Sequence, residues 1–213
     1  MGSMHYKKSG ILGIVAIAVM AGSMNVANAA VSPFAVSFTT VADVVLSEVT
    51  PLNFGTNVFI ANGGICDMGV VPAPASLVTV PAQTGAAGTS GNITGAGCLT
   101  VNAGANGNTL GYYTVVGLGG QSVTVTVASA SNADFDFAPA GCVANFDGGA
   151  GGDTCDTFTA DNPIVARLSD AGDDGTVLLN STTIVVGGRI TVGATDLTPA
   201  TAYTQNFNIT AVY

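Results

Sequence analysis

The sequence predicts an all-β protein, an antiparallel β-sandwich of immunoglobulin-like architecture. Short segments in which apolar and polar residues alternate recur along the chain, separated by Gly-rich and Asn-Gly turn signals. Gly, Ala, Val, Thr, Asn and Asp dominate while Lys, Glu and Arg are scarce, a composition that is poor for helices and good for strands and turns. No window of helical length carries an apolar stripe with a 3.6-residue period.

The first 29 residues read as a secretory signal peptide. Lys7 and Lys8 form a short basic region, and the apolar run at residues 10–22 is too short to span a bilayer comfortably. A small-x-small cleavage pattern ends at Ala29. We therefore predict export with removal of this leader, and a mature chain of residues 30–213 that folds as a single β-sandwich domain.

Removal of the leader leaves a strongly acidic chain. Both lysines and His5 leave with it, so Arg167 and Arg189 stand against 13 acidic residues and give a net charge of −11. Such a surface repels phosphate backbones and anionic lipid heads, which argues against nucleic-acid binding and against stable membrane insertion. The two arginines are expected to offset neighbouring carboxylates.

The predicted strands follow from alternation between turn signals. The clearest is 121–129, where Val123, Val125 and Val127 share one face and threonines the other. In chain order the predicted strands are residues 35–47, 56–60, 76–80, 98–101, 109–117, 121–129, 133–137, 163–169, 183–193 and 206–213. The intervening stretches 81–97 and 140–161 are predicted to be long loops.

The terminal strand is amphipathic along its whole length. Phe207, Ile209, Ala211 and Tyr213 alternate with polar or smaller residues and therefore fall on one face. Chain ends usually fray unless a sheet holds them, so this pattern predicts that the strand is paired.

The cysteines predict two disulfides. Their number is even, and Cys66, Cys98, Cys142 and Cys155 all lie in the exported part of the chain. Four cysteines allow three pairings, and we favour the local one, Cys66–Cys98 with Cys142–Cys155, because cysteines that are near in sequence meet most easily.

Catalysis has few residues to use. The mature chain has no His and no Lys, which excludes Ser-His-Asp, Cys-His and Schiff-base arrangements. Carboxylate pairs remain at Asp134/Asp136 and at Asp173/Asp174, but the first pair is expected to point outward, opposite phenylalanines on the other face of a strand. We expect neither enzymatic activity nor a cofactor.

One Gly-rich acidic loop is a weak candidate for calcium. Asp147, Asp153 and Asp156 offer the hard oxygen ligands that calcium prefers, and residues 148–156 fit a calcium-binding nonapeptide pattern. That motif works by stacking in tandem, however, and here it occurs once. The alternative is a disulfide-closed loop whose aspartates are solvated.

Both ends of the chain carry a family resemblance. TPLNFGT (residues 50–56) follows a long extended segment, and residues 184–213 combine a VGG-x-[IL]-x-V strand pair, a Pro-containing turn and a Tyr-x-x-x-Phe-x-[IV]-x-x-x-Tyr strand. Together with the leader, these motifs resemble secreted bacterial β-sandwich proteins of uncharacterised function, similar in layout to spore coat protein U and to chaperone–usher-type fimbrial (pilin) subunits.

The resemblance implies a structural subunit of an extracellular surface filament, a pilus or fimbria. Such subunits are incomplete sandwiches completed by a donor strand from a neighbour's N-terminal extension. Here that segment is about residues 30–40, with Phe34, Val36 and Phe38 on one apolar face. The terminal strand would border the acceptor groove. The implied partners are identical subunits in a homopolymer, a periplasmic chaperone and an outer-membrane assembly protein.

Two alternatives stay open. In a self-contained coat or adhesin-like surface protein, residues 34–46 would pair within their own subunit. A small outer-membrane β-barrel would also end on an aromatic residue, although several strands here are shorter than such barrels need and Trp is absent.

Overall fold

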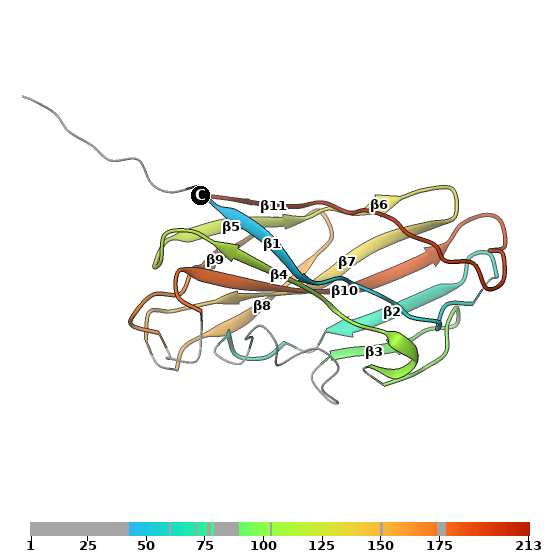
Figure 1. The fold of residues 1–213 in the computed structure, drawn as a ribbon, viewed down its shortest axis with the longest axis horizontal. Coiled ribbons are helices and arrows are strands. Elements are labelled where there is room, and N and C mark those ends of the chain that lie inside the picture. Colours follow the sequence, from blue (N-terminus) through green and yellow to red (C-terminus); the bar gives the residue numbers. More distant parts are fainter. Residues whose placement is uncertain are drawn as a thin grey trace, which may run out of the picture. The chain divides into compact units, whose positions relative to one another are not determined.

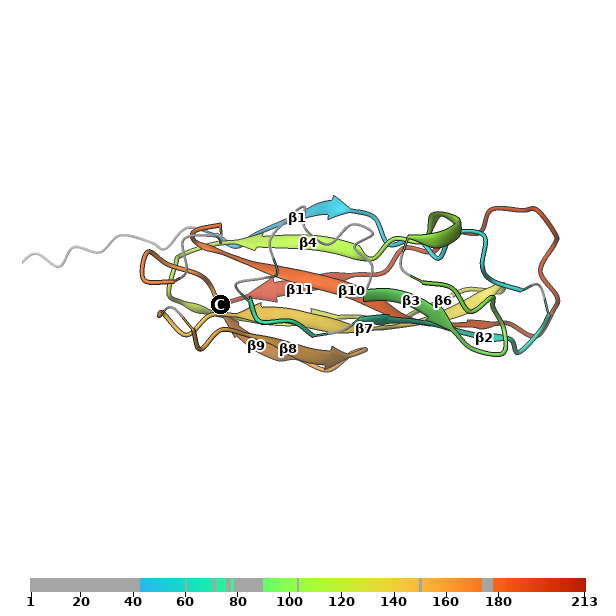
Figure 2. The ribbon, with the colours of Figure 1, turned by 90° about the horizontal axis from the view of Figure 1, so that it is seen from below.

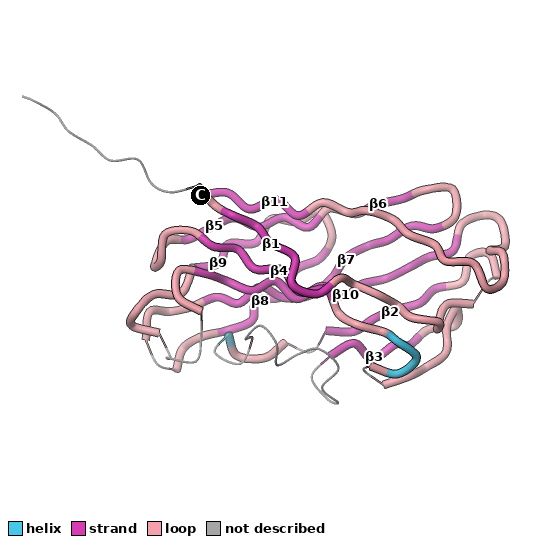
Figure 3. The backbone as a smooth tube through the Cα atoms, viewed as in Figure 1, coloured by secondary structure: helices cyan, strands magenta, loops and turns pink. Residues whose placement is uncertain are grey.

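The computed structural model describes residues 43–59, 61–70, 72–75, 78, 90–102, 104–149, 151–173 and 178–213. The predicted leader and the predicted donor residues Phe34, Val36 and Phe38 lie outside the described residues. The described part is all-β, as predicted (Figures 1 and 3). Its strands are β1 Val45–Thr50, β2 Ile65–Val70, β3 Ser90–Thr94, β4 Gly111–Val116, β5 Ser122–Val127, β6 Ala130–Ser131, β7 Phe135–Asn145, β8 Thr154–Thr159, β9 Ile164–Arg167, β10 Ser181–Val192 and β11 Ile209–Val212, with a short 3-10 helix, η2, at Ala105–Gly107.

The larger sheet is organised around β10. Among the described residues it contains eight strands: β7 pairs along one edge of β10, while β4 and then β2 pair along the other. β1 lies outside β4, β3 outside β2, and β6 and β8 outside β7, and every pairing is antiparallel. Gly188, with φ 132°, stands where β10 changes partner from β4 to β2, and a Cβ there would collide with the carbonyl oxygen of Ala138. Only glycine fits this position without strain.

The smaller sheet has the order β11-β5-β9. In β5, Val123, Val125 and Val127 are buried, while Thr124 and Thr126 on the opposite face are half-buried. The predicted period of two is therefore confirmed. The three strands align through Val125, which lies opposite residue 211 of β11 and residue 164 of β9.

Buried side chains from strands of both sheets form the core. Figure 2 shows the strands turned by 90° from the view of Figure 1. Tyr113 of β4 and Phe137 of β7 reach across from the larger sheet to Phe207, which lies two residues before the start of β11. At the other side of the interface, the Asn145 side-chain oxygen at the end of β7 accepts a hydrogen bond of 2.8 Å from the backbone N–H of Arg167 in β9. The fold is an antiparallel β-sandwich.

Several predicted boundaries are wrong. The loop predicted at 81–97 contains β3, and the loop predicted at 140–161 contains the second half of β7 and all of β8. β2 was not predicted at all. β3 and β8 lack a clear apolar alternation and contain Gly, Asn or Asp, which are depleted in strands, so neighbouring strands and a disulfide hold them in extended form.

Other predicted strands are shorter or weaker than expected. The described residues of the predicted segments 56–60 and 98–101 form isolated bridges, at Val58–Cys98 and Ile93–Val101, rather than strands. Of 76–80, only Val78 is described, and it is not in a strand. Of the predicted opening strand 35–47, residues 45–47 belong to β1, which begins at Val45 and runs on to Thr50, while the described residues 43 and 44 lie outside it.

Candidate functional site

Each sheet ends in an edge strand on one side of the sandwich. β11 pairs only with β5, and β1 pairs only with β4, so within the described residues each has one backbone edge without a strand partner. β1 is exposed along five of its six residues, including Val45 and Val49. Edge strands with exposed apolar side chains are potential sites for pairing with another chain. The predicted groove-bordering strand is therefore an edge strand.

The predicted alternation in the terminal strand is present in the structure. Phe207, Ile209 and Ala211 are half-buried and pack against the core, whereas Asn208 and Thr210 are exposed. The Phe207 ring is the main anchor: it lies edge-on to Tyr113, at 5.9 Å between ring centroids, and tilted against Phe137, at 5.3 Å. The backbone N–H of Ala128 donates a hydrogen bond of 2.8 Å to the Asn208 carbonyl and extends the ladder to β5.

Tyr213 departs from the simple alternation. Its side chain is 49% exposed, yet its hydroxyl accepts a hydrogen bond from the backbone N–H of Leu118 in the β4–β5 turn. A Cβ on Gly117 would collide with the Tyr213 hydroxyl, so glycine at this position allows the ring to approach the turn. The end of β11 is thus attached to the β4–β5 turn as well as to β5.

The β1 edge carries an exposed carboxylate, that of Glu48. Glu48 is the ladder partner of Tyr113, so the two side chains share the face of the sheet that packs on Phe207. Burial raises the pKa of Tyr113 to about 12, with a further contribution from the negative charge of Glu48, while a hydrogen bond with the Leu52 backbone acts in the opposite direction. Charged side chains on edge strands discourage indiscriminate strand pairing.

The favoured disulfide pairing is confirmed. Cys66 of β2 is joined to Cys98, with 5.3 Å between their Cα atoms, and Cys142 of β7 is joined to Cys155 of β8, with 5.4 Å. All four cysteines are buried. The second bridge ties together the hairpin that was predicted as a loop. Two disulfides indicate an oxidising, extracytoplasmic compartment.

The structure brings together two of the three calcium candidates. Asp147 and Asp153 lie with Asp173, which comes from the loop after β9, so that one carboxylate oxygen from each lies within 4.8 Å of the others. Asp156 is elsewhere: it lies in β8, where its carboxylate accepts hydrogen bonds from Asn145 at 2.6 Å and from the Thr154 hydroxyl at 2.7 Å. Because Asp173 is 20 positions further along the chain, only the pairing of strands shows that it joins the loop.

Backbone N–H groups of the loops and an arginine already bind these carboxylates. Asp153 accepts a hydrogen bond from the Asp147 N–H at 3.1 Å, and buried Asp173 accepts bonds from the N–H groups of Gly148 at 2.9 Å and Asp170 at 2.5 Å. Arg167 forms an ion pair with Asp170 and lies 3.6 Å from Asp173. The arrangement joins two loops electrostatically, as the expected role of Arg167 requires, and its internal bonds give no independent sign of a bound cation.

Asp134 and Asp136, the first of the predicted carboxylate pairs, are both exposed. Asp136 is exposed in β7, while Phe135 and Phe137 on the opposite face are buried, as predicted. Asp134 lies exposed in the turn before β7, and Asp174 falls outside the described residues.

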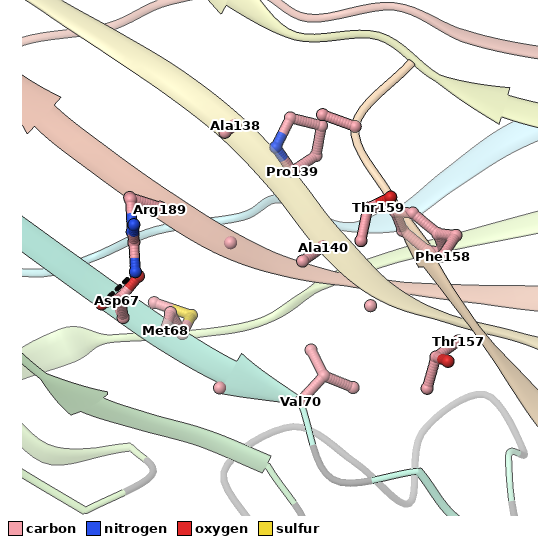
Figure 4. Close-up of a pocket in the computed structure, with 14 residues that line it drawn as sticks. Asp67, Met68, Val70, Ala138, Pro139, Ala140, Thr157, Phe158, Thr159 and Arg189 are labelled. Atoms are coloured by element: carbon pink, nitrogen blue, oxygen red, sulfur yellow. Dashed lines mark hydrogen bonds and ion pairs between the residues drawn. The ribbon is translucent and has the colours of Figure 1, made fainter. Parts of the chain in front are cut away.

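The outer face of the larger sheet carries a shallow hollow of about 570 Å³ (Figure 4). Its floor is formed by small residues of β7 and β10, among them Ala138, Ala140 and Gly188. At one end of the hollow, the Arg189 guanidinium donates two hydrogen bonds, of 2.7 and 3.2 Å, to the Asp67 carboxylate. The bond to Asp67 and its charge raise the pKa of Arg189. Arg189, like Arg167, offsets a carboxylate, as predicted.

Comparison with known proteins leaves the site to be judged from its own geometry. Among the described residues, no helix is long and apolar enough to cross a membrane. No family model, no curated protein and no solved structure matches the chain.

Proposed function

We propose that this chain is an exported structural subunit of an extracellular, pilus-like filament, assembled by β-strand donation. The donor is the N-terminal segment of a neighbouring subunit, with Phe34, Val36 and Phe38 as its apolar face, and the acceptor is the side of the sandwich between β1 and β11. The subunit has no catalytic role. Its partners are identical copies, a periplasmic chaperone and an outer-membrane assembly protein.

The observation that carries the proposal is the pair of edge strands at the ends of the two sheets. Among the described residues, β1 and β11 each have one edge without a strand partner, and β-augmentation derives its affinity from main-chain hydrogen bonds to such an edge. The inward side chains of β11 are only half-buried, so they retain apolar surface for an alternating strand to cover. The segment with the required alternation, Phe34 to Phe38, precedes β1 in the sequence.

A self-contained coat or adhesin-like surface protein is the second candidate. It is favoured by the pairing of β1 with β4 of the same chain over Val45–Thr50, which gives the larger sheet its own opening strand. In that case the edges would stay free, and Glu48 would serve to keep them free.

Strand donation predicts polymers that resist mild denaturant, because exchanged strands are kinetically trapped. The test compares two full-length variants with the same added charge, V36D/F38D and S37D/T39D. The first pair places aspartates on the apolar face of the donor and should yield monomers. The second pair places them on the opposite face and should leave polymers intact. Polymers of equal length from both variants, or a stable monomer from the wild-type chain at high concentration, would contradict the proposal.

A further inference from the structure

Six large apolar side chains are exposed at the end of the sandwich where β1 begins, β4 ends and β10 begins. Each is between 42% and 57% exposed. We call this group the end patch: Val45, Val116, Leu118, Leu178, Leu179 and Tyr213. The C-terminus and the start of β1 lie at this same end (Figure 1).

The end patch is contiguous through backbone contacts. Val116 is the ladder partner of Val45 on one side and of Ser181 on the other. The N–H of the next residue, Gly117, donates a hydrogen bond of 2.9 Å to the carbonyl of Asn180, which directly follows the two leucines. The Leu118 N–H donates to the Tyr213 hydroxyl. Four segments of the chain therefore present their apolar side chains together.

Local structure holds the two leucines in their exposed position. The Leu178 carbonyl accepts hydrogen bonds from the hydroxyls of Ser169 and Ser181, the latter at 2.6 Å. Asn180 has φ 59°, a left-handed conformation, and its N–H donates to the Ser169 carbonyl at 3.0 Å. The backbone on both sides of Leu179 is thus fixed while both leucines stay more than half exposed.

The composition of the end patch is that of a protein contact. It contains no charged residue, although the chain has a formal net charge of −9. The ion pair of Arg167 and Asp170 lies at its border, beside Gly120. An uncharged apolar centre with a polar rim is the usual anatomy of an interface, and contiguous exposed apolar groups mark interaction sites.

The short connection to the donor segment identifies the occupant. Phe38 is five residues before Asp43, so an extended connection spans at most about 18 Å. A neighbour that holds Phe38 must therefore lie within about 18 Å of Asp43. Asp43 is two residues from Val45, a member of the end patch. The subunit that receives the donor strand thus comes close to the end patch.

We propose that the end patch seats against a second copy of this chain, the copy that receives the N-terminal donor strand. This inference rests on the proposed function. It adds a second contact to strand donation: the donor strand makes each junction slow to dissociate, and the end patch fixes the orientation of one subunit on the next.

Footprinting tests the contact directly. The wild-type polymer and the monomeric V36D/F38D chain would be labelled with a small carbene reagent and compared by mass spectrometry. Residues 116–118, 178–179 and 213 should be labelled severalfold less in the polymer, whereas exposed Leu99, near the Cys66–Cys98 disulfide, should be labelled equally in both. Equal labelling of the end patch in polymer and monomer would overturn the inference and leave strand donation standing. Absence of any wild-type polymer would overturn both.

Two variants test the contribution of the end patch to filament assembly. L178S/L179S removes the two most exposed side chains of the end patch, and L99S removes an exposed leucine elsewhere. Loss of central apolar anchors typically weakens a contact about tenfold or more. We expect L178S/L179S to give junctions that still resist mild denaturant but filaments visibly more flexible and about tenfold shorter, while L99S matches wild type. Filaments of wild-type length and stiffness from L178S/L179S, with its monomer melting as the wild type does, would refute the seating role.

Discussion

Replacement of Phe207 by Ala tests how β11 is held. The ring is the largest side chain that the terminal segment places against the core, between Tyr113 at 5.9 Å and Phe137 at 5.3 Å. β11 itself contributes a ladder of four residue pairs to β5 and nothing to a second strand among the described residues. The aromatic contact is therefore expected to supply much of the docking energy.

The expected loss follows from the partial burial of the ring. A fully buried Phe→Ala change costs about 3–5 kcal/mol, and each aromatic pair adds about 0.5–1.5 kcal/mol to the area term. Because Phe207 is only half-buried, the free energy of unfolding should fall by about 2–3 kcal/mol. For a domain of this size that corresponds to a drop in Tm of roughly 5–10 °C.

Urea unfolding and calorimetry of F207A measure this loss, and N208A is the matched control. Asn208 is the next residue, but its side chain is exposed, so its change should stay within about 0.5 kcal/mol. Hydrogen exchange of the β5 amides should also accelerate in F207A, because β11 would detach more often. Equal stability of F207A and N208A, with unchanged exchange in β5, would refute the view that the ring anchors the strand.

Four further predictions concern other parts of the fold. R167M should lower the free energy of unfolding by about 1–3 kcal/mol, measured in urea, because it leaves the buried carboxylate of Asp173 without its nearby cation; an unchanged midpoint would show that the backbone bonds suffice. The pKa of Tyr113 is about 12 in the folded protein against about 10 in the unfolded chain, so the contribution of its protonated form to the free energy of unfolding is fully present below pH ~10 and is lost as the pH rises towards 12. The Tm of Y113F should therefore drop less than that of the wild type between pH 9 and 12, and identical slopes of Tm against pH would contradict this. G141A should cost about 1–3 kcal/mol because a Cβ would collide with the Val185 carbonyl, whereas G69A, whose Cβ would lie 3.9 Å from its nearest neighbour, should be nearly neutral; similar denaturation midpoints for the two would argue against this packing. Millimolar calcium or a chelator should leave Tm unchanged, since loop N–H groups and an arginine already satisfy the acidic loop cluster; a rise of several degrees with calcium would reverse that conclusion.

The sequence by itself determined the fold class and much of the local pattern. Alternation of apolar residues is a local property, so β5, the apolar parts of β4 and β10 and the faces of the terminal strand could be predicted from it. The preferred disulfide pairing followed from sequence separation, which governs how readily two cysteines meet. The absence of His and Lys beyond the predicted leader restricted the chemistry without any structure.

Some segments carry no local strand signal, and only the tertiary structure decided that they form strands. β3 and β8 contain mainly polar residues and Gly, and they are strands because β2 and β7 offer them a ladder. The same holds for the sites. Asp173 lies close to Asp147, and the segment that contains Leu179 lies beside the one that contains Val116, because strands that are distant in sequence pair with each other. Such contacts depend on which strands lie side by side, and the period-two pattern within one strand carries no information about its neighbour.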